Sequence, residues 1–196
     1  MAKPQFKTLE SLRGKKISIT GLGGTVHVAI LLALEKLGVN PKDFVSKPLV
    51  KGARVLDLFC GSGAYGLEAL SRGAKQAIFV ESAREAIVKL EANIETTGFD
   101  SASEVMWADV KSTLKLPADD RMDLVFLDPP YNMPLAQVRA DLESLVTGGW
   151  LADEGRILVH RTVKEAQLKP FGLDLMWERE YGQSRILVFC HEEEEE

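Results

Sequence analysis

Short apolar runs alternate with helix-like segments between residues 53 and 190, and this alternation strongly constrains the fold. Six apolar runs are predicted to be strands, namely residues 53–59, 76–81, 103–109, 122–128, 155–161 and 184–190. Three helices are predicted between them, at residues 64–72, 83–97 and 134–146, each followed by a glycine. This order predicts an α/β fold with a doubly wound, mainly parallel sheet, in which ligands bind at the carboxyl ends of the strands.

Composition divides the chain into three parts. Residues 1–50 hold a basic strand candidate, a glycine-rich turn and an amphipathic helix, so we expect a small N-terminal extension. Its lysines and arginine make it a candidate RNA contact, although a solvated terminus explains them equally well. Residues 51–190 are the expected catalytic domain, and residues 191–196 an acidic tail expected to be disordered. The last five residues are glutamates and account for the whole formal net charge of −5.

The remaining composition excludes several classes of protein. Two cysteines, Cys60 and Cys190, are too few and too far apart for a disulfide framework or a metal site. The most apolar stretch, residues 26–34, is too short to span a membrane. We therefore expect a soluble, cytoplasmic protein that is a monomer and holds no metal.

The first predicted strand runs into "DLFCGSGAYG", which contains Gly61, Gly63 and Gly66 in a G-x-G-x-x-G spacing. Such glycines let a ligand lie against the main chain at the start of a helix. One interpretation is a dinucleotide site with Glu81 on the ribose, as in an NAD-dependent oxidoreductase. However, Asp57 places a carboxylate beside the loop, where it would repel a pyrophosphate. The acid favours a cationic ligand such as S-adenosyl-L-methionine.

Acidic residues also follow the second and third predicted strands, at Glu81 and Asp109. Asp109 is a candidate acceptor for an adenine amino group, with Trp107 or Val110 covering a ring face. Each acid has a structural alternative, because Glu81 or Asp109 would also suit the start of the following helix. Trp107 is more often a core residue than a cofactor wall.

The fourth predicted strand ends in "LDPPYN", residues 127–132. The prolines fix an extended loop, and they leave the Asp128 carboxylate and the Pro129 carbonyl as acceptors with few competing donors. Two fixed acceptors suit the two hydrogens of a planar exocyclic amine, and Tyr131 offers a stacking face for a flipped-out base. The alternative is an ordinary strand that ends in a proline turn.

These motifs together resemble one known family. The stretch "VLDLFCGSGAYGLEALSRGA", the acid Glu81, "WADV", "DLVFLDPPYN", "GGWLADEGRILV" and "REYGQSRILVF" are similar to the bacterial 16S rRNA (guanine-966-N2)-methyltransferase family. The resemblance runs from about residue 52 to 189 and implies a Rossmann-like class I methyltransferase fold. The N-terminal part departs from it, because His27 and Val28 stand where the family has an arginine and an acid.

The resemblance implies S-adenosyl-L-methionine as the methyl donor and small-subunit rRNA, or an assembling ribosomal particle, as the partner. Asp57 would contact the methionine end, Glu81 the ribose and Asp109 the adenine. The full candidate cofactor set is Asp57, Phe59, Gly61, Ser62, Gly63, Glu81, Ser82, Asp109 and Val110. The candidate catalytic set is Asp128, Pro129, Pro130 and Tyr131.

Three functions remain open on the sequence. The first is a methyltransferase acting on the N2 amine of a guanine in 16S rRNA, with a DNA adenine-N6 or cytosine-N4 methyltransferase as its variant. The second is an NAD-dependent oxidoreductase, which Asp57 disfavours. The third is a catalytically retired scaffold that still binds S-adenosylmethionine.

Overall fold

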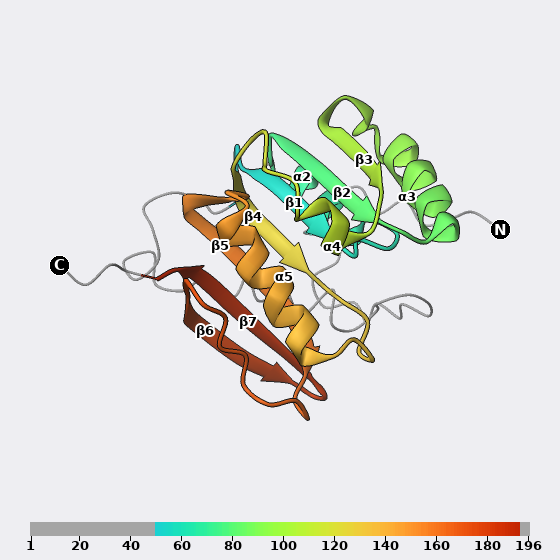
Figure 1. Ribbon diagram of the computed structural model, residues 1–196. Helices are drawn as coiled ribbons and strands as arrows, with labels where there is room; N and C mark the ends of the chain where they lie inside the picture. Colours follow the sequence, from blue (N-terminus) through green and yellow to red (C-terminus); the bar gives the residue numbers. More distant parts are fainter. Residues whose placement is uncertain (1–49, 193–196) are drawn as a thin grey trace, which may run out of the picture.

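The computed structural model describes residues 50–192 (Figure 1). The predicted N-terminal strand, turn and helix, including His27 and Val28, lie outside the described residues, as do the last four glutamates. Within the described range no helix is long and apolar enough to cross a membrane.

Seven strands form one sheet in the order β3-β2-β1-β4-β5-β7-β6. The pairs among β1 to β5 are parallel, whereas β7 is antiparallel to both β5 and β6. The predicted doubly wound, mainly parallel sheet is therefore confirmed. The strands are β1 (Arg54–Leu58), β2 (Gln76–Glu81), β3 (Ser103–Trp107), β4 (Met122–Leu127), β5 (Leu151–Thr162), β6 (Leu173–Tyr181) and β7 (Ser184–His191).

The helices connect the parallel strands and cover both faces of the sheet (Figure 1). Gly98 ends α3 in a left-handed conformation with a φ of 73°, as predicted for a glycine stop. At the end of α5, however, Gly148 is right-handed and Gly149 takes the positive φ. The helices are α2 (Ala64–Ser71), α3 (Arg84–Thr97), α4 (Val110–Thr113) and α5 (Leu135–Thr147), with a 3-10 turn η2 (Asp100–Ala102) before β3.

Strand β1 is apolar on both faces because it is central in the sheet. Leu56 and Leu58 pack into the core under α4 and α5, whereas Val55 packs on the opposite face with residues of α2 and α3. By this alternation Asp57 points to the same face as Val55, toward the start of α2. The alternation therefore buries a carboxyl group beside the glycine-rich loop.

The strand predictions have three corrections. Strand β6 is missing from them, because its nine residues include four charged side chains and its pairing with β7 is irregular between Leu175 and Trp177. Strand β5 begins earlier than predicted, at Leu151, because the exposed acids Asp153 and Glu154 interrupt the apolar pattern of the strand. Strand β3 ends at Trp107, so Asp109 lies beyond the strand rather than on it.

Candidate functional site

The glycine loop, residues 59–63, joins β1 to α2 at the carboxyl edge of the sheet. Phe59 has a φ of 56°, which is rare for a residue other than glycine, and Gly61 and Gly63 have φ values of 55° and 79°. Gly66, in the first turn of α2, has no room for a side chain, because a Cβ there would lie 2.3 Å from the Phe79 ring. A Cβ on Gly61 would meet nothing within 4 Å among the described residues. Main chain at Gly61 thus borders open space.

Asp57 lies fully buried below this loop. Its Oδ2 accepts a hydrogen bond of 2.9 Å from the Gly66 amide, but its Oδ1 is buried with no hydrogen-bond partner among the described residues. Burial raises the pKa of Asp57 to about 8, and the carboxylates of Asp128 and Glu81 add to the rise. At pH 7 the group is therefore mostly neutral. A cationic ligand would pair with the ionised form of Asp57. Asp57 must therefore lose its proton when such a ligand binds beside it.

Glu81 stands at the end of β2 and is held by three main-chain amides. Its Oε2 accepts from the Gly61 amide at 3.0 Å, and its Oε1 accepts from the amides of Ser82 and Ala83 at 2.8 and 2.7 Å. The last two contacts lie just before α3, whose N-cap residue is Ala83 and has no side-chain cap, so Glu81 does not itself cap this helix. The first ties Glu81 to the glycine loop. Glu81 therefore fixes the loop, while its ribose contact stays a prediction.

Asp109 caps helix α4, because its Oδ1 accepts from the Ser112 amide at 3.0 Å and from the Ser112 hydroxyl at 3.1 Å. The structural alternative for Asp109 is thus present, and its adenine contact stays a prediction. Trp107 is not a core residue: its side chain is 62% exposed and its indole donates to the Ser82 carbonyl at 2.9 Å. Val110 is buried in the core.

The proline loop, residues 128–133, follows β4 and lies beside β1, since the Asp128 amide donates to the Leu58 carbonyl at 3.4 Å. Asp128 Oδ1 lies 2.8 Å from His160 Nδ1, and His160 Nε2 lies 3.1 Å from the Tyr131 hydroxyl. Tyr65 of α2 also forms a hydrogen bond to Asp128. Burial raises the pKa of this tyrosine, and the Asp128 and Asp57 carboxylates raise it further.

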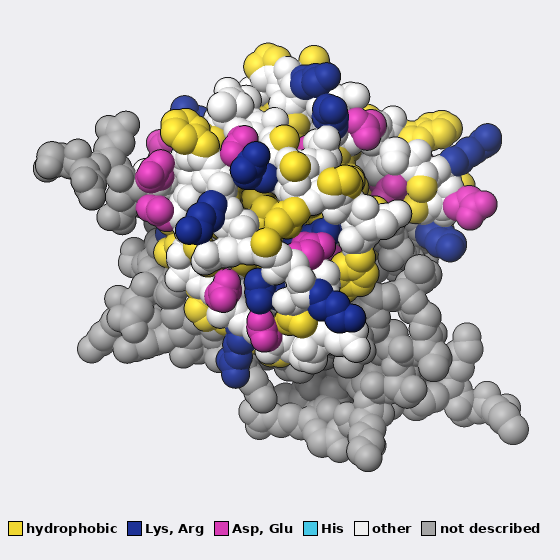
Figure 2. All heavy atoms as spheres, turned by 60° about the horizontal axis from the view of Figure 1, so that its bottom comes forward, with side chains coloured by type: hydrophobic (Ala, Val, Ile, Leu, Met, Phe, Trp, Pro, Cys, Tyr) yellow, Lys and Arg dark blue, Asp and Glu magenta, His cyan; other side chains and the backbone are white. Residues whose placement is uncertain are grey.

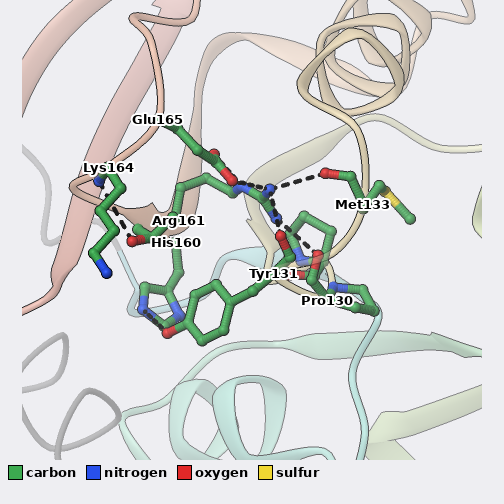
Figure 3. A network of polar contacts seen from close by, with 9 residues as sticks. Pro130, Tyr131, Met133, His160, Arg161, Lys164 and Glu165 are labelled. Atoms are coloured by element: carbon green, nitrogen blue, oxygen red, sulfur yellow. Dashed lines mark hydrogen bonds and ion pairs between the residues drawn. The ribbon is translucent and has the colours of Figure 1, made fainter.

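The main chain of the proline loop is held by Arg161, which is 1% exposed. Its guanidinium donates to the carbonyls of Pro129, Pro130 and Met133 at 3.2, 3.0 and 3.0 Å (Figure 3). Its Nε also donates to Glu165 at 2.8 Å. The prediction that few donors compete for the Pro129 carbonyl is therefore wrong, because Arg161 donates to it. A carbonyl oxygen has two lone pairs, so Pro129 keeps capacity for one more donor.

Sequence reasoning missed both His160 and Arg161. They are consecutive residues of β5, 6% and 1% exposed, and they directly follow the apolar residues 157–159. Two buried cationic or titratable side chains in a central strand are an available signal, because such groups are rarely buried without partners. Their partners cannot be read from the sequence, since the contacts join residues about 30 positions apart.

The two loops form one site rather than two. Asp128 is among the charges that raise the pKa of Asp57, and Tyr65 interacts with both carboxyl groups. On the face shown in Figure 2, Lys and Arg side chains are interspersed with Asp and Glu, and hydrophobic side chains are exposed between them. Among the described residues, this face shows mixed charge instead of one basic patch.

A central parallel sheet, a glycine loop after β1 and a proline loop after β4 define the class I methyltransferase fold. Residues 43–190 match the family described as Conserved hypothetical protein 95, and the chain belongs to this family. The resemblance drawn from the motifs is confirmed by relatives called Ribosomal RNA small subunit methyltransferase D. That of Haemophilus influenzae is 33% identical, with 69% of this chain and 70% of the relative covered.

Two further likenesses come from Escherichia coli. The Ribosomal RNA small subunit methyltransferase D of strain K12 is 38% identical, over 60% of this chain and 57% of its own. The solved structure of yhhF has a TM-score of 0.73 and 28% identity, covering 92% of this chain and 94% of its own. The fold is thus shared over nearly the whole of a solved relative.

Proposed function

We propose that this protein transfers the methyl group of S-adenosyl-L-methionine to the exocyclic N2 amine of a guanine in small-subunit rRNA. The observation that carries the proposal is the meeting of two half-sites at one sheet edge. At the end of β1 lie a buried Asp57 carboxyl oxygen with no hydrogen-bond partner among the described residues and the open main chain at Gly61. At the end of the neighbouring strand β4 lie Asp128 and the exposed ring of Tyr131.

The residues of the glycine-loop side fit the methyl donor. Asp57 Oδ1 is a buried polar atom with no hydrogen-bond partner among the described residues, and once ionised it would accept from the ammonium of the donor. Gly61 and Gly63 would let the donor lie against main chain, with Glu81 at its ribose and Asp109 at its adenine. Phe59, Ser62, Ser82 and Val110 complete the proposed binding set. Bound there, the donor supplies an electrophilic methyl group on a sulfonium that leaves as a neutral thioether.

The residues of the proline-loop side suit an acceptor amine. Asp128 would accept one N–H of the amine and the Pro129 carbonyl the other, which orients the nitrogen lone pair toward the methyl carbon. In the transfer, the nitrogen would form its bond to the methyl carbon as the S–C bond breaks with its electron pair left on sulfur. The excess proton on the nitrogen would pass to the Asp128 carboxylate that accepts its N–H, and from there to water. Tyr131 is 56% exposed and would stack on the flipped-out base.

Ribosomal RNA is the proposed substrate because relatives of this chain are named as small-subunit rRNA methyltransferases. A nucleobase in DNA, with an adenine N6 or cytosine N4 amine, presents the same pair of hydrogens and remains the second candidate. The mixed charge of Figure 2 gives few phosphate contacts, so an assembling ribosomal particle should be a better substrate than free RNA.

The test supplies labelled methyl donor with naked 16S rRNA, with small-subunit particles and with duplex DNA, followed by digestion and mass spectrometry of the nucleosides. We expect N2-methylguanosine in RNA, with more label from particles. N6-methyladenine or N4-methylcytosine in DNA would replace the substrate proposed here. Label in none of the three, together with normal donor binding, would identify a catalytically retired scaffold.

A parallel titration calorimetry experiment tests the cofactor. The methyl donor should bind and NAD should not, and replacing Asp57 or Glu81 by alanine should weaken donor binding by about 1.5–3 kcal/mol, the size of a hydrogen bond to a charged group. Unchanged affinity in both variants would show that the two acids act only in holding the glycine loop.

A further inference from the structure

We propose that His160 is the positioning residue of the proline loop, and that it fixes the Asp128 carboxylate and the Tyr131 ring relative to each other. This inference rests on the proposed function, because Asp128 and Tyr131 are the groups that would contact the acceptor base. His160 itself lies behind them, 6% exposed on β5, and contacts no part of the proposed substrate position directly.

The hydrogen-bond geometry assigns a different task to each ring nitrogen of His160. Nδ1 faces Asp128 Oδ1 at 2.8 Å, and an ionised carboxylate can only accept, so Nδ1 must carry the proton. Nε2 is then an acceptor in the neutral ring, and the Tyr131 hydroxyl 3.1 Å away donates to it. The chain Tyr131–His160–Asp128 therefore has one direction of donation, and both ring nitrogens of His160 have a partner.

The position of Tyr131 explains why such a tie is needed. Its ring is 56% exposed, and an exposed side chain without an anchor samples several rotamers. The hydroxyl contact and an edge-on arrangement with the imidazole, with 5.6 Å between ring centroids and 77° between planes, limit the ring to one orientation. Figure 3 shows the Tyr131 hydroxyl directed at the His160 ring. A fixed ring loses less conformational freedom when a base stacks on it.

Arg161, the next residue of β5, completes the same arrangement from the other face of the strand. It binds the carbonyls of the proline loop, while His160 binds the side chains, so consecutive residues hold the two parts of the loop (Figure 3). The main chain is therefore fixed without His160. What His160 adds is the orientation of the two side chains that meet the acceptor, and this separates its role from that of a core residue.

The first test needs no activity and therefore stands even if the proposed substrate is wrong. Nitrogen-15 NMR of the histidine-labelled protein at pH 8.5, where an ordinary imidazole is neutral, should show the proton of His160 on Nδ1. His160→Gln identifies the signal by its loss. In Tyr131→Phe the same tautomer should persist while the Nε2 resonance shifts, because it loses its donor. A proton on Nε2 in the unaltered protein would overturn the proposal.

The second test uses a matched pair of variants with steady-state methyl transfer to small-subunit particles. Asparagine places its amide near the position of Nδ1, and glutamine reaches the position of Nε2. His160→Asn keeps the Asp128 contact, so we expect kcat to change little and KM for the particle to rise about fivefold, the size of one ordinary hydrogen bond. His160→Gln loses the Asp128 contact, and kcat should fall roughly tenfold or more.

Two controls make the result specific. His191→Asn alters a histidine on the neighbouring strand β7 whose Nε2 faces only the Leu151 carbonyl, at 3.4 Å, and it should behave as the unaltered protein. The double variant His160→Asn with Tyr131→Phe should be no worse than Tyr131→Phe alone, because both remove the same contact.

Methyl-donor affinity should stay within about twofold in all these variants, since the donor contacts the other loop. If kcat falls and KM rises to the same extent in His160→Asn and His160→Gln, His160 acts only by packing. If both variants are as active as His191→Asn, His160 has no role. If the unaltered protein methylates no RNA, the proposed function fails while the NMR result still decides the contacts of His160.

Discussion

The two halves of the site hold their carboxyl groups by different means. On the glycine-loop side, Asp57 and Glu81 are held by main-chain amides that lie 1 to 20 residues away in sequence. On the proline-loop side, Asp128 is held by the side chain of His160, 32 residues away, and the loop carbonyls by Arg161. The first half is therefore held by main-chain donors, and the second by side chains of the neighbouring strand β5.

This difference has consequences for stability and for mutation. Main-chain donors are supplied by almost any sequence that adopts the turn, so the glycine loop depends mainly on residues that permit its backbone angles. Side-chain donors depend on residue identity, and a buried charge that loses its partner is costly. The proline-loop half should therefore be the more sensitive of the two to substitutions outside its own motif.

Arg161→Met should give the largest effect, a loss of about 3–5 kcal/mol in the free energy of unfolding, because it leaves Glu165 and several loop carbonyls without their buried donor. Urea denaturation measures it. Arg139→Met, which breaks an exposed helix pair with Glu143 at 3.8 Å, should cost no more than about 0.5 kcal/mol. Similar losses in the two variants would contradict the contrast between the halves. Adding Glu165→Gln to Arg161→Met should restore part of the loss.

Asp128→Ala should reduce methyl transfer by roughly 100-fold or more, because it removes the acceptor that orients the amine. Donor affinity should stay within about twofold, since the donor binds the other half. Rate and affinity are measured by label transfer to particles and by calorimetry. Asp153→Ala, which alters an exposed acid paired with Arg121, is the control and should change neither quantity. Full activity of the Asp128 variant would remove the proline loop from the reaction.

The same contrast explains how much the sequence could predict. The alternation of apolar runs and helices led to the sheet and to the loops at its carboxyl edge, because burial on two faces leaves a continuous apolar pattern in each strand. Asp57 and the glycines were identified because their contacts are local. The pairing of β6 with β7 was not predicted, since an edge strand rich in charge has no such pattern.

His160 and Arg161 show most clearly what could not be predicted from the sequence. Their partners are set by the alignment of β4 with β5, which pairs Leu127 with Val159 and so brings the proline loop beside the next two residues. A single sequence contains no direct record of that alignment. The protonation of Asp57 was missed for a related reason, because its pKa depends on burial by segments distant in sequence.

Gly61→Ala and Gly98→Ala form a matched pair for the glycine-loop half. Both positions have a positive φ, 55° and 73°, and at both a Cβ would meet nothing within 4 Å of the described residues. Each variant should lose about 1–2 kcal/mol of stability from the left-handed backbone. Only Gly61→Ala should also weaken methyl-donor binding, because its Cβ would enter the proposed donor position. Equal donor affinities, measured by calorimetry, would show that the open space at Gly61 holds no donor.

A further prediction concerns the charge of Asp57. Its pKa is raised to about 8, so the folded protein holds a proton that the unfolded chain releases at much lower pH. The stability that this proton contributes is fully present below the ordinary carboxyl pKa and is lost as the pH rises through about 8. Asp57→Asn removes the dependence. The free energy of unfolding of the Asp57→Asn variant, relative to that of the unaltered protein, should therefore increase from pH 5 to pH 9. Urea denaturation at both pH values measures it.

Binding of the methyl donor should reverse this protonation. If the donor's ammonium pairs with Asp57 Oδ1, the carboxyl group ionises in the complex, and most of one proton is released at pH 7. Donor affinity should accordingly rise with pH up to about 8 and fall above it, where the free donor's own amino group loses its proton. Calorimetry in buffers of different ionisation enthalpy counts the protons, and Asp57→Asn should show neither the release nor the slope. Proton uptake, or release that persists in the asparagine variant, would place the donor's cation away from Asp57 and leave the glycine loop without its proposed charge partner.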